Sequence, residues 1–149
     1  MTDPVEPFDL TDFTPYLLNI AAEVESLEFS ATYKSRYGMT RPEWRVLFHI
    51  GRYGDMTAKD IGIRARIHKT KISRAVRALE EKRFLTRRTL PDDRRFELLS
   101  LRPPGRTAYL DLANAAAAFE TALVARLGQR DAKTLKRVLR KLADHGDSE

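Results

Sequence analysis

The residues with the most distinctive chemistry lie between Ile61 and Leu79, where the sequence has six basic side chains and no Asp or Glu. Apolar residues at Ile72, Val76 and Leu79 predict the buried side of a helix over roughly residues 68–83. At about 100° per residue, four polar side chains share the opposite face of that helix. Arginine can pair bidentately with guanine, and hydroxyls can bond bases or phosphates, which is the chemistry of a DNA-reading helix. These four residues are Thr70, Ser73, Arg74 and Arg77.

Two lysines stand at the start of the same helix, where free backbone N–H groups from His68 to Thr70 also favour a phosphate. A solvated basic surface is the alternative, but such a helix usually carries acids among its bases. Here Glu80 and Glu81 come only where the helix ends. The residues of this helix that we assign to DNA binding are Lys69, Thr70, Lys71, Ser73, Arg74 and Arg77.

A basic hairpin is predicted directly after this helix. Two short strands, at residues 85–89 and 96–101, are joined by a turn-rich segment. A hairpin arm with arginines at its tip can enter the minor groove of DNA, where narrow A·T-rich segments concentrate negative potential. We expect Asp93 to brace one arginine through an ion pair, and the alternative is a solvated turn. The arginines assigned to DNA binding are Arg87, Arg88, Arg94 and Arg95.

Charge is distributed unevenly along the 149-residue chain, which has 27 Lys and Arg, 21 Asp and Glu, and a net charge of +6. Residues 1–33 hold seven acids and no Lys or Arg, whereas residues 34–106 hold 20 bases and eight acids. Residues 107–149 are nearly neutral. A basic segment between an acidic and a neutral one predicts a module that binds a polyanion, here double-stranded DNA.

Several classes of protein are disfavoured by what the sequence lacks. It has no cysteine, which excludes disulfide scaffolds, zinc–cysteine modules and thiol chemistry. It has no nucleophile elbow, H-E-x-x-H, P-loop or dinucleotide motif, so we expect neither an enzyme nor a cofactor. The three histidines form no paired ligand motif, so metal control is only a weak alternative. Without a long apolar run or a secretion signal, a cytoplasmic protein with no membrane partner is expected.

Two helices are predicted before the basic stretch. The apolar stripe that begins at Phe13 has spacings of three and four residues and predicts a first helix that ends before Gly38. The segment Thr40-Arg41-Pro42-Glu43 fits a capping box, in which the Thr hydroxyl and the Glu carboxylate each accept a backbone N–H. It predicts the start of a second helix that stops around residues 51–54.

Further helices are predicted on either side of the basic helix and hairpin. A short helix fits residues 57–64, with Ile61 and Ile63 as core candidates. The chain becomes helical again from about residue 103, and a last helix is expected with Asp131 as its cap and Gly146 as its stop.

Together these elements predict an α+β fold that is mainly α, with a small β hairpin and a winged helix-turn-helix core flanked by long helices. The flanking helices have more apolar surface than the small core can cover, so we expect a partner chain to cover it. The alternative is that they pack on each other within one chain. The expected domains are an N-terminal arm and dimerisation helix over residues 1–37, the DNA-binding domain over 38–101 and C-terminal dimerisation helices over 102–149. The residues assigned to the dimer interface are Phe13, Tyr16, Leu17, Ile20, Leu135, Val138, Leu139 and Leu142.

Three segments of the chain resemble the multiple antibiotic resistance regulator (MarR) family. Residues 40–47, Thr-Arg-Pro-Glu-Trp-Arg-Val-Leu, look like the start of its second helix, and residues 68–80 resemble its recognition helix. Pro91-Asp92-Asp93-Arg94-Arg95, with Leu99-Ser100-Leu101 and Gly105-Arg106, is similar to its wing and the start of its fifth helix. The resemblance extends over nearly the whole chain. It implies a winged-helix homodimer, joined by its first, fifth and sixth helices, that acts as a bacterial transcription regulator and usually as a repressor relieved by a small ligand.

The sequence departs from the family pattern at three places. Arg102 stands where a capping Thr is frequent, and Leu90 stands where an acid is common. The N-terminal cysteine of the peroxide-sensing branch is absent, so control by cysteine oxidation is not expected.

The resemblance also implies an effector pocket between the dimer-forming helices and the winged helix. Its candidate residues are aromatic side chains four apart on the first helix, a cation and a histidine four apart on the second, and one later tyrosine. An aromatic carboxylate or its coenzyme A thioester would suit aromatic walls and a cation. The alternative is that the aromatic stripe is core and that Arg45 forms a structural or surface ion pair. The candidates are Phe29, Tyr33, Tyr37, Arg45, His49 and Tyr109.

The sequence leaves the ligand, the operator, the target genes and the sign of regulation open, and it allows residues 1–12 to be a disordered arm or a segment swapped between partners. The predicted function is a sequence-specific DNA-binding regulator that binds a palindromic operator as a homodimeric repressor and is released by a small ligand. An architectural protein that binds DNA without sequence preference is the alternative.

Overall fold

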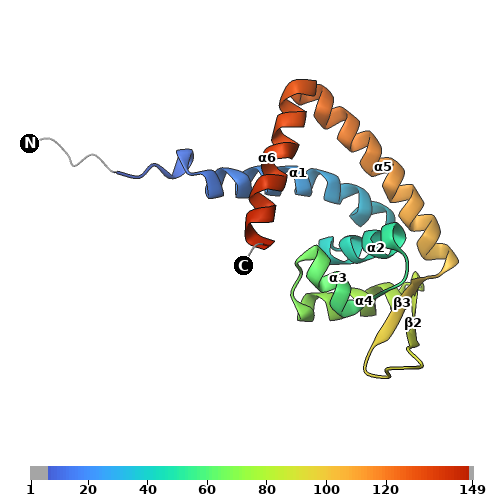
Figure 1. Cartoon of the computed structure of the whole chain (residues 1–149). Coiled ribbons are helices and arrows are strands. Elements are labelled where there is room, and N and C mark those ends of the chain that lie inside the picture. The colour runs from blue at the N-terminus through green and yellow to red at the C-terminus, as the bar shows by residue number, and fades with distance from the viewer. Residues whose placement is uncertain (1–6, 148–149) are drawn as a thin grey trace, which may run out of the picture. The chain divides into compact units, whose positions relative to one another are not determined.

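The computed structural model describes residues 7–147 and has the predicted fold, mainly α with a small antiparallel sheet (Figure 1). Of the N-terminal arm, residues 1–6 lie outside the described part, and Leu10–Asp12 form one 3-10 turn capped by the Asp9 side chain. The helices are α1 (Thr14–Tyr37), α2 (Arg41–Tyr53), α3 (Ala58–Ala65), α4 (Lys69–Glu81), α5 (Pro103–Leu127) and α6 (Gln129–Asp147), and the strands are β1 (Met56–Thr57), β2 (Leu85–Thr89) and β3 (Glu97–Leu101).

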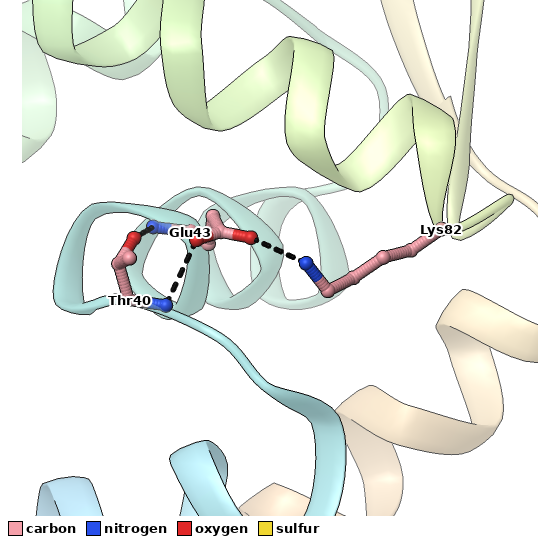
Figure 2. Close-up of polar contacts among 3 residues, drawn as sticks. All are labelled: Thr40, Glu43 and Lys82. Carbon is pink, nitrogen blue, oxygen red and sulfur yellow. Dashed lines mark hydrogen bonds and ion pairs between the residues drawn. The ribbon is translucent and has the colours of Figure 1, made fainter.

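The ends of α1 and α2 are set by the local signals that predicted them. Gly38 follows α1 in the left-handed conformation, with φ at 64°, and its N–H donates to the Lys34 carbonyl. The capping box before α2 is complete: the Glu43 N–H donates to the Thr40 hydroxyl at 3.4 Å, and the Thr40 N–H donates to Glu43 Oε2 at 2.9 Å (Figure 2). Both ends therefore depend on residues within a few positions of the boundary.

The Glu43 carboxylate also links α2 to α4. Its other oxygen, Oε1, accepts a hydrogen bond from Nζ of Lys82, the residue that caps the end of α4 (Figure 2). Burial acts to raise the pKa of the Glu43 carboxyl, but the hydrogen bonds from Thr40 and Lys82 outweigh it and lower that pKa below its ordinary value. A buried carboxylate is tolerated here because hydrogen bonds and a cation surround it.

The core of the winged helix is formed by the apolar faces of α2, α3 and α4 against the sheet. The predicted core residues of α4, Ile72, Val76 and Leu79, are all buried. On α3, Ile61 is fully buried, but the prediction for Ile63 was wrong because this side chain is 67% exposed. Side chains two positions apart on a helix, such as Ile61 and Ile63, are separated by about 200° around its axis. A short helix therefore cannot bury both against one core.

A third strand joins the predicted hairpin. The sheet order is β1-β3-β2, and all pairs are antiparallel. Met56 pairs with Leu99, and Thr57 pairs with Leu98. Two residues show no alternation of apolar and polar side chains, so β1 could not be read from the sequence.

The start of α5 lies against the backbone that precedes β2. The Arg102 N–H donates to the Phe84 carbonyl at 2.8 Å, and a Cβ at Gly105 would overlap that same carbonyl group. Only glycine allows such an approach of a helix to a backbone segment. α5 begins at Pro103, directly after Arg102, even though arginine is a poor capping residue.

The chain divides into two compact units, Met1–Tyr109 and Leu110–Glu149, which we describe separately. In the second unit, Gly128, with φ at 87°, separates α5 from α6, and the Lys136 ammonium pairs with the Glu120 carboxylate. The expected ends of α6 were wrong by a few residues: Asp131 lies within the first turn, and the helix runs past Gly146. Of the helices between residues 7 and 147, none is long and apolar enough to cross a membrane.

Candidate nucleic-acid interface

The polar face of α4, defined as Thr70, Ser73, Arg74 and Arg77, lies in solvent. All four side chains are exposed, and the buried residues of α4 are on its other side. Glu80, in the last turn, forms an ion pair with Arg87 of β2. The polar face of α4 thus offers hydroxyls and guanidiniums to a ligand.

The start of α4 is partly closed to an anion. Nδ1 of His68 accepts a hydrogen bond from the Thr70 N–H at 3.2 Å. One of the backbone N–H groups that the sequence offered to a phosphate is therefore already used. Lys69 and Lys71 are both exposed next to this turn and leave it positively charged.

Asp93 holds Arg95 in a fixed orientation at the tip of the wing, the β2–β3 hairpin. Arg95 donates from Nε and Nη2 to the two Asp93 oxygens, each at 2.9 Å, and the Arg95 N–H donates to Oδ1 at 3.1 Å. The hydrogen bonds from Arg95 lower the pKa of Asp93, and the same contact raises the pKa of Arg95. Such a bidentate pair orients the guanidinium plane, although its exposure to solvent limits its strength.

The other wing arginines have different surroundings. Arg87 of β2 lies 3.1 Å from Glu80 and 3.7 Å from Glu97, so two carboxylates balance its charge. Arg88 has one distant partner, Asp55, at 4.0 Å. Arg94 is exposed in the turn. Arg88 and Arg94 are consequently better placed than Arg87 to meet a polyanion.

A cavity of about 600 Å³ connects the recognition helix with the wing. Its lining includes Lys69 and Ser73 from α4, Lys59 from α3, and Arg95 with Phe96 from the wing. The cation of Lys59 also lies 6.0 Å from the centre of the Phe96 ring. Residues from two predicted DNA-binding elements thus share one concave surface, in which three cations border a mostly apolar lining that includes Ile63, Ile67 and Ile72. The third cation, Lys59, is an addition that the sequence did not single out.

Three predicted effector residues meet in a chain of aromatic contacts. Phe29 and Tyr33 of α1 are buried, and their ring centres lie 5.3 and 5.8 Å from that of Trp44. Trp44 contacts Phe48 at 4.0 Å, and Phe48 contacts Tyr109 at 5.1 Å. Trp44 and Phe48 were not among the predicted effector residues, although their four-residue spacing could have identified them as part of this cluster.

The remaining effector candidates make other contacts. Tyr37 packs its ring on Phe84 at 5.9 Å. Arg45 is half-buried and donates from Nη2 to the carbonyl of Ala65 in α3. Nδ1 of His49 lies 2.6 Å from the Arg45 carbonyl oxygen. The guanidinium of Arg45 is thus held at the α2–α3 contact, where the structure gives it a structural partner.

The predicted dimer residues form an exposed apolar stripe in each unit. Phe13, just before α1, and Leu17 and Ile20 on α1 are more than two-fifths exposed, and Tyr16 is half-buried. On α6, the exposed fractions of the four leucine and valine side chains are 37–46%. Exposed apolar stripes are what the predicted dimer interface requires. The α6 residues are Leu135, Val138, Leu139 and Leu142.

No group of three His, Asp or Glu side chains suited to a metal ion occurs within the described residues. The model of the MarR family matches residues 37–95, which span the end of α1 through the wing tip. No curated protein matches the sequence.

Solved structures of transcriptional regulators are similar to the chain over nearly its whole length. A MarR family regulator from Silicibacter pomeroyi DSS-3 is 27% identical, with a TM-score of 0.79 over 92% of this chain and 97% of that one. A probable transcriptional regulator from Pseudomonas aeruginosa is 26% identical, with a TM-score of 0.74 over 90% and 99%. BpsR of Bordetella bronchiseptica, whose DNA binding is regulated by 6-hydroxynicotinic acid, is 21% identical, with a TM-score of 0.83 over 93% and 98%.

Proposed function

We propose that this chain is a winged helix-turn-helix regulator of the MarR family, which binds DNA, and that it acts as a homodimeric repressor of a palindromic operator. We further propose that a small ligand releases it from that operator. The observation that carries the proposal is that the exposed polar face of α4 lies next to a concave surface, bordered by cations, that α4 shares with the wing. There the polar face of α4 is exposed, and Lys69, Ser73 and Arg95 line one cavity.

In the proposed complex, α4 lies in the major groove and the wing reaches the adjacent minor groove. Arg74 and Arg77 read base edges, while Lys69 and Lys71 contact phosphates. Arg95, oriented by Asp93, enters the minor groove. Two such subunits place their recognition helices about 34 Å apart, one turn of DNA, which is the geometry that matches a palindrome.

Dimerisation is proposed through the exposed apolar stripes of α1 and α6. Burying one leucine or valine side chain contributes about 1.5–3 kcal/mol, and each protomer offers several. Closed twofold symmetry is the commonest arrangement of soluble homo-oligomers. The apolar stripes therefore support a homodimer.

The proposed ligand is an aromatic acid or its coenzyme A thioester. The chain of rings from Phe29 through Trp44 to Tyr109 supports this class, because flat rings pack well against aromatic walls. BpsR, a relative with the same fold, responds to 6-hydroxynicotinic acid, an aromatic acid. The ligand acts by favouring a spacing of the two recognition helices that does not fit the operator, which requires different affinities for the two spacings.

The deciding experiment is selection of bound duplexes from a random DNA library, followed by comparison of the winners with random DNA at several salt concentrations. A palindromic winner that binds at least about a thousandfold more tightly than random duplex supports the repressor. Binding without sequence preference contradicts it and supports an architectural role. No binding to any duplex at low salt refutes both functions.

A further inference from the structure

A second cavity, distinct from the one between α4 and the wing, lies where the start of α2 meets the turn between α3 and α4. Its volume is about 600 Å³. The polar side chains that line it are Arg41 and Arg45 from α2, Arg66 and His68 from the turn, and Lys71 from α4. No Asp or Glu is among its described lining residues. Four permanent cations thus surround one small volume.

Arg45 contributes a cation that is fixed in place. Its guanidinium donates to the Ala65 carbonyl and is half-buried. Burial, and then repulsion from Arg41, lower the pKa of Arg45. Placing like charges together in a partly desolvated site costs free energy, and a bound anion offsets that cost.

Arg66 adopts a backbone conformation that favours glycine. It follows α3 in the left-handed region, with φ at 55°. The Ile67 N–H closes the turn by donating to the Gly62 carbonyl at 3.1 Å, a helix ending in which the left-handed residue is usually glycine. An arginine at such a position is held against the backbone preference. Its side chain lines the cavity.

We propose that this cavity binds a phosphate group. Phosphate fits because guanidinium forks and an ammonium donate several charge-assisted hydrogen bonds to oxyanions. The phosphate comes either from the DNA backbone or from a free phosphate compound. The first source rests on the proposed function, since Lys71 also belongs to the recognition helix.

The first test is titration of the free protein with inorganic phosphate, followed by NMR of the Ile67 and His68 backbone amides. Chloride at equal ionic strength is the reference anion. Wild type shows a saturable shift with phosphate and none with chloride. Arg66→Gly suits the comparison because glycine relieves the left-handed backbone, so the variant folds at least as well as wild type. It binds phosphate roughly tenfold more weakly, as expected when one charge-assisted hydrogen bond is removed.

Lys34→Gln is the matched control, because it also removes one positive charge but lies on α1, outside the cavity. It leaves the affinity for phosphate within about twofold of wild type, since exposed charges at a distance are screened. No saturable shift in wild type overturns the proposal. Equal weakening in Arg66→Gly and Lys34→Gln also overturns it, because the effect is then one of net charge.

A second experiment identifies the source of the phosphate. Arg41→Gln and Lys34→Gln are compared for binding to one duplex as the salt concentration rises. If a backbone phosphate occupies the cavity, the plot of log K against log salt is less steep for Arg41→Gln. Its slope decreases in magnitude by about 0.9 for each phosphate that the protein no longer neutralises. The decrease is the same for selected and random duplexes. An unchanged slope, together with weakened phosphate binding, assigns the cavity to a free phosphate compound. The phosphate titration needs no DNA, so failure of the proposed function does not affect its result.

Discussion

Nζ of Lys82 lies 2.9 Å from Oε1 of Glu43, a residue 39 positions earlier in the chain. The contact joins the end of α4 to the start of α2. The other Glu43 oxygen accepts a hydrogen bond from the Thr40 N–H. One carboxylate therefore caps α2 and also anchors α4, the helix that carries the proposed DNA-binding face. The orientation of α4 thus depends on a residue outside the proposed DNA-binding face.

Removing the Glu43 charge destabilises the fold in a pH-dependent way. The pKa of Glu43 is lower in the folded chain than its ordinary value of 4.5, so its stabilisation is present above that value and is lost as pH falls through the folded pKa. Glu43→Gln lowers the free energy of unfolding by about 1–3 kcal/mol at pH 7. Urea denaturation of wild type and Glu43→Gln, repeated at steps of about one pH unit between about pH 3 and 7, measures the difference in the free energy of unfolding. The exposed Glu81→Gln is the control, and a deficit that does not shrink in acid contradicts the prediction.

Two glycine substitutions separate a backbone clash from a side-chain clash. A Cβ at Gly105 meets the Phe84 backbone, whereas a Cβ at Gly51 meets the ring of Tyr109. A ring can turn aside, but the Phe84 segment is fixed by its hydrogen bond from Arg102. Gly105→Ala therefore costs about 2–3 kcal/mol, near the upper end for overpacking, and Gly51→Ala costs less. Thermal denaturation ranks the two, and the reverse order disproves the assignment.

The two isoleucines of α3 provide a test of the core. Ile61 is fully buried and Ile63 is largely exposed, although they are two residues apart. Ile61→Ala lowers the free energy of unfolding by about 2–5 kcal/mol, while Ile63→Ala changes it by less than about 0.5 kcal/mol. Chemical denaturation of both variants decides, with each serving as the control for the other. Similar losses contradict the described packing of α3.

Base reading and phosphate binding are separated by two substitutions on α4. Arg74→Ala weakens binding to the selected duplex by about 1–3 kcal/mol and relaxes the preference at one base position. Lys69→Ala weakens binding to all duplexes by similar factors and reduces the salt slope. Fluorescence anisotropy with selected and random duplexes measures both effects. An unchanged sequence preference in Arg74→Ala refutes its role as a base reader.

The α1 stripe is tested by adding the same charge at two neighbouring positions. Leu17 lies in the apolar stripe, whereas the exposed Asn19 lies about 200° away around the helix. Leu17→Lys raises the dimer dissociation constant by at least about tenfold, since it replaces roughly 1.5–3 kcal/mol of apolar burial with a charge. Asn19→Lys leaves it nearly unchanged. Sedimentation equilibrium gives both constants, and a monomeric wild type excludes the proposed dimer.

Much of the fold could be predicted from the sequence because its signals are local. Gly38 ends α1, and the Thr40–Glu43 capping box starts α2, each through groups only a few residues apart. The periodicity of α4 separated its buried and exposed sides correctly for Ile72, Val76 and Leu79. Such patterns fail for short elements, as the missed strand β1 and the misplaced Ile63 demonstrate.

The sequence by itself determined the order of the helices, the polar face of α4 and the arginine-rich wing, because the hydrogen bonds and spacings that fix them lie within a few residues. Only the tertiary structure decided how these charges are used. It paired Arg87 with Glu80 and Glu97, and it gathered Arg41, Arg45, Arg66 and Lys71 around one cavity. Such contacts join residues distant in the chain, so the neighbours of each charge are set by packing and not by the local sequence.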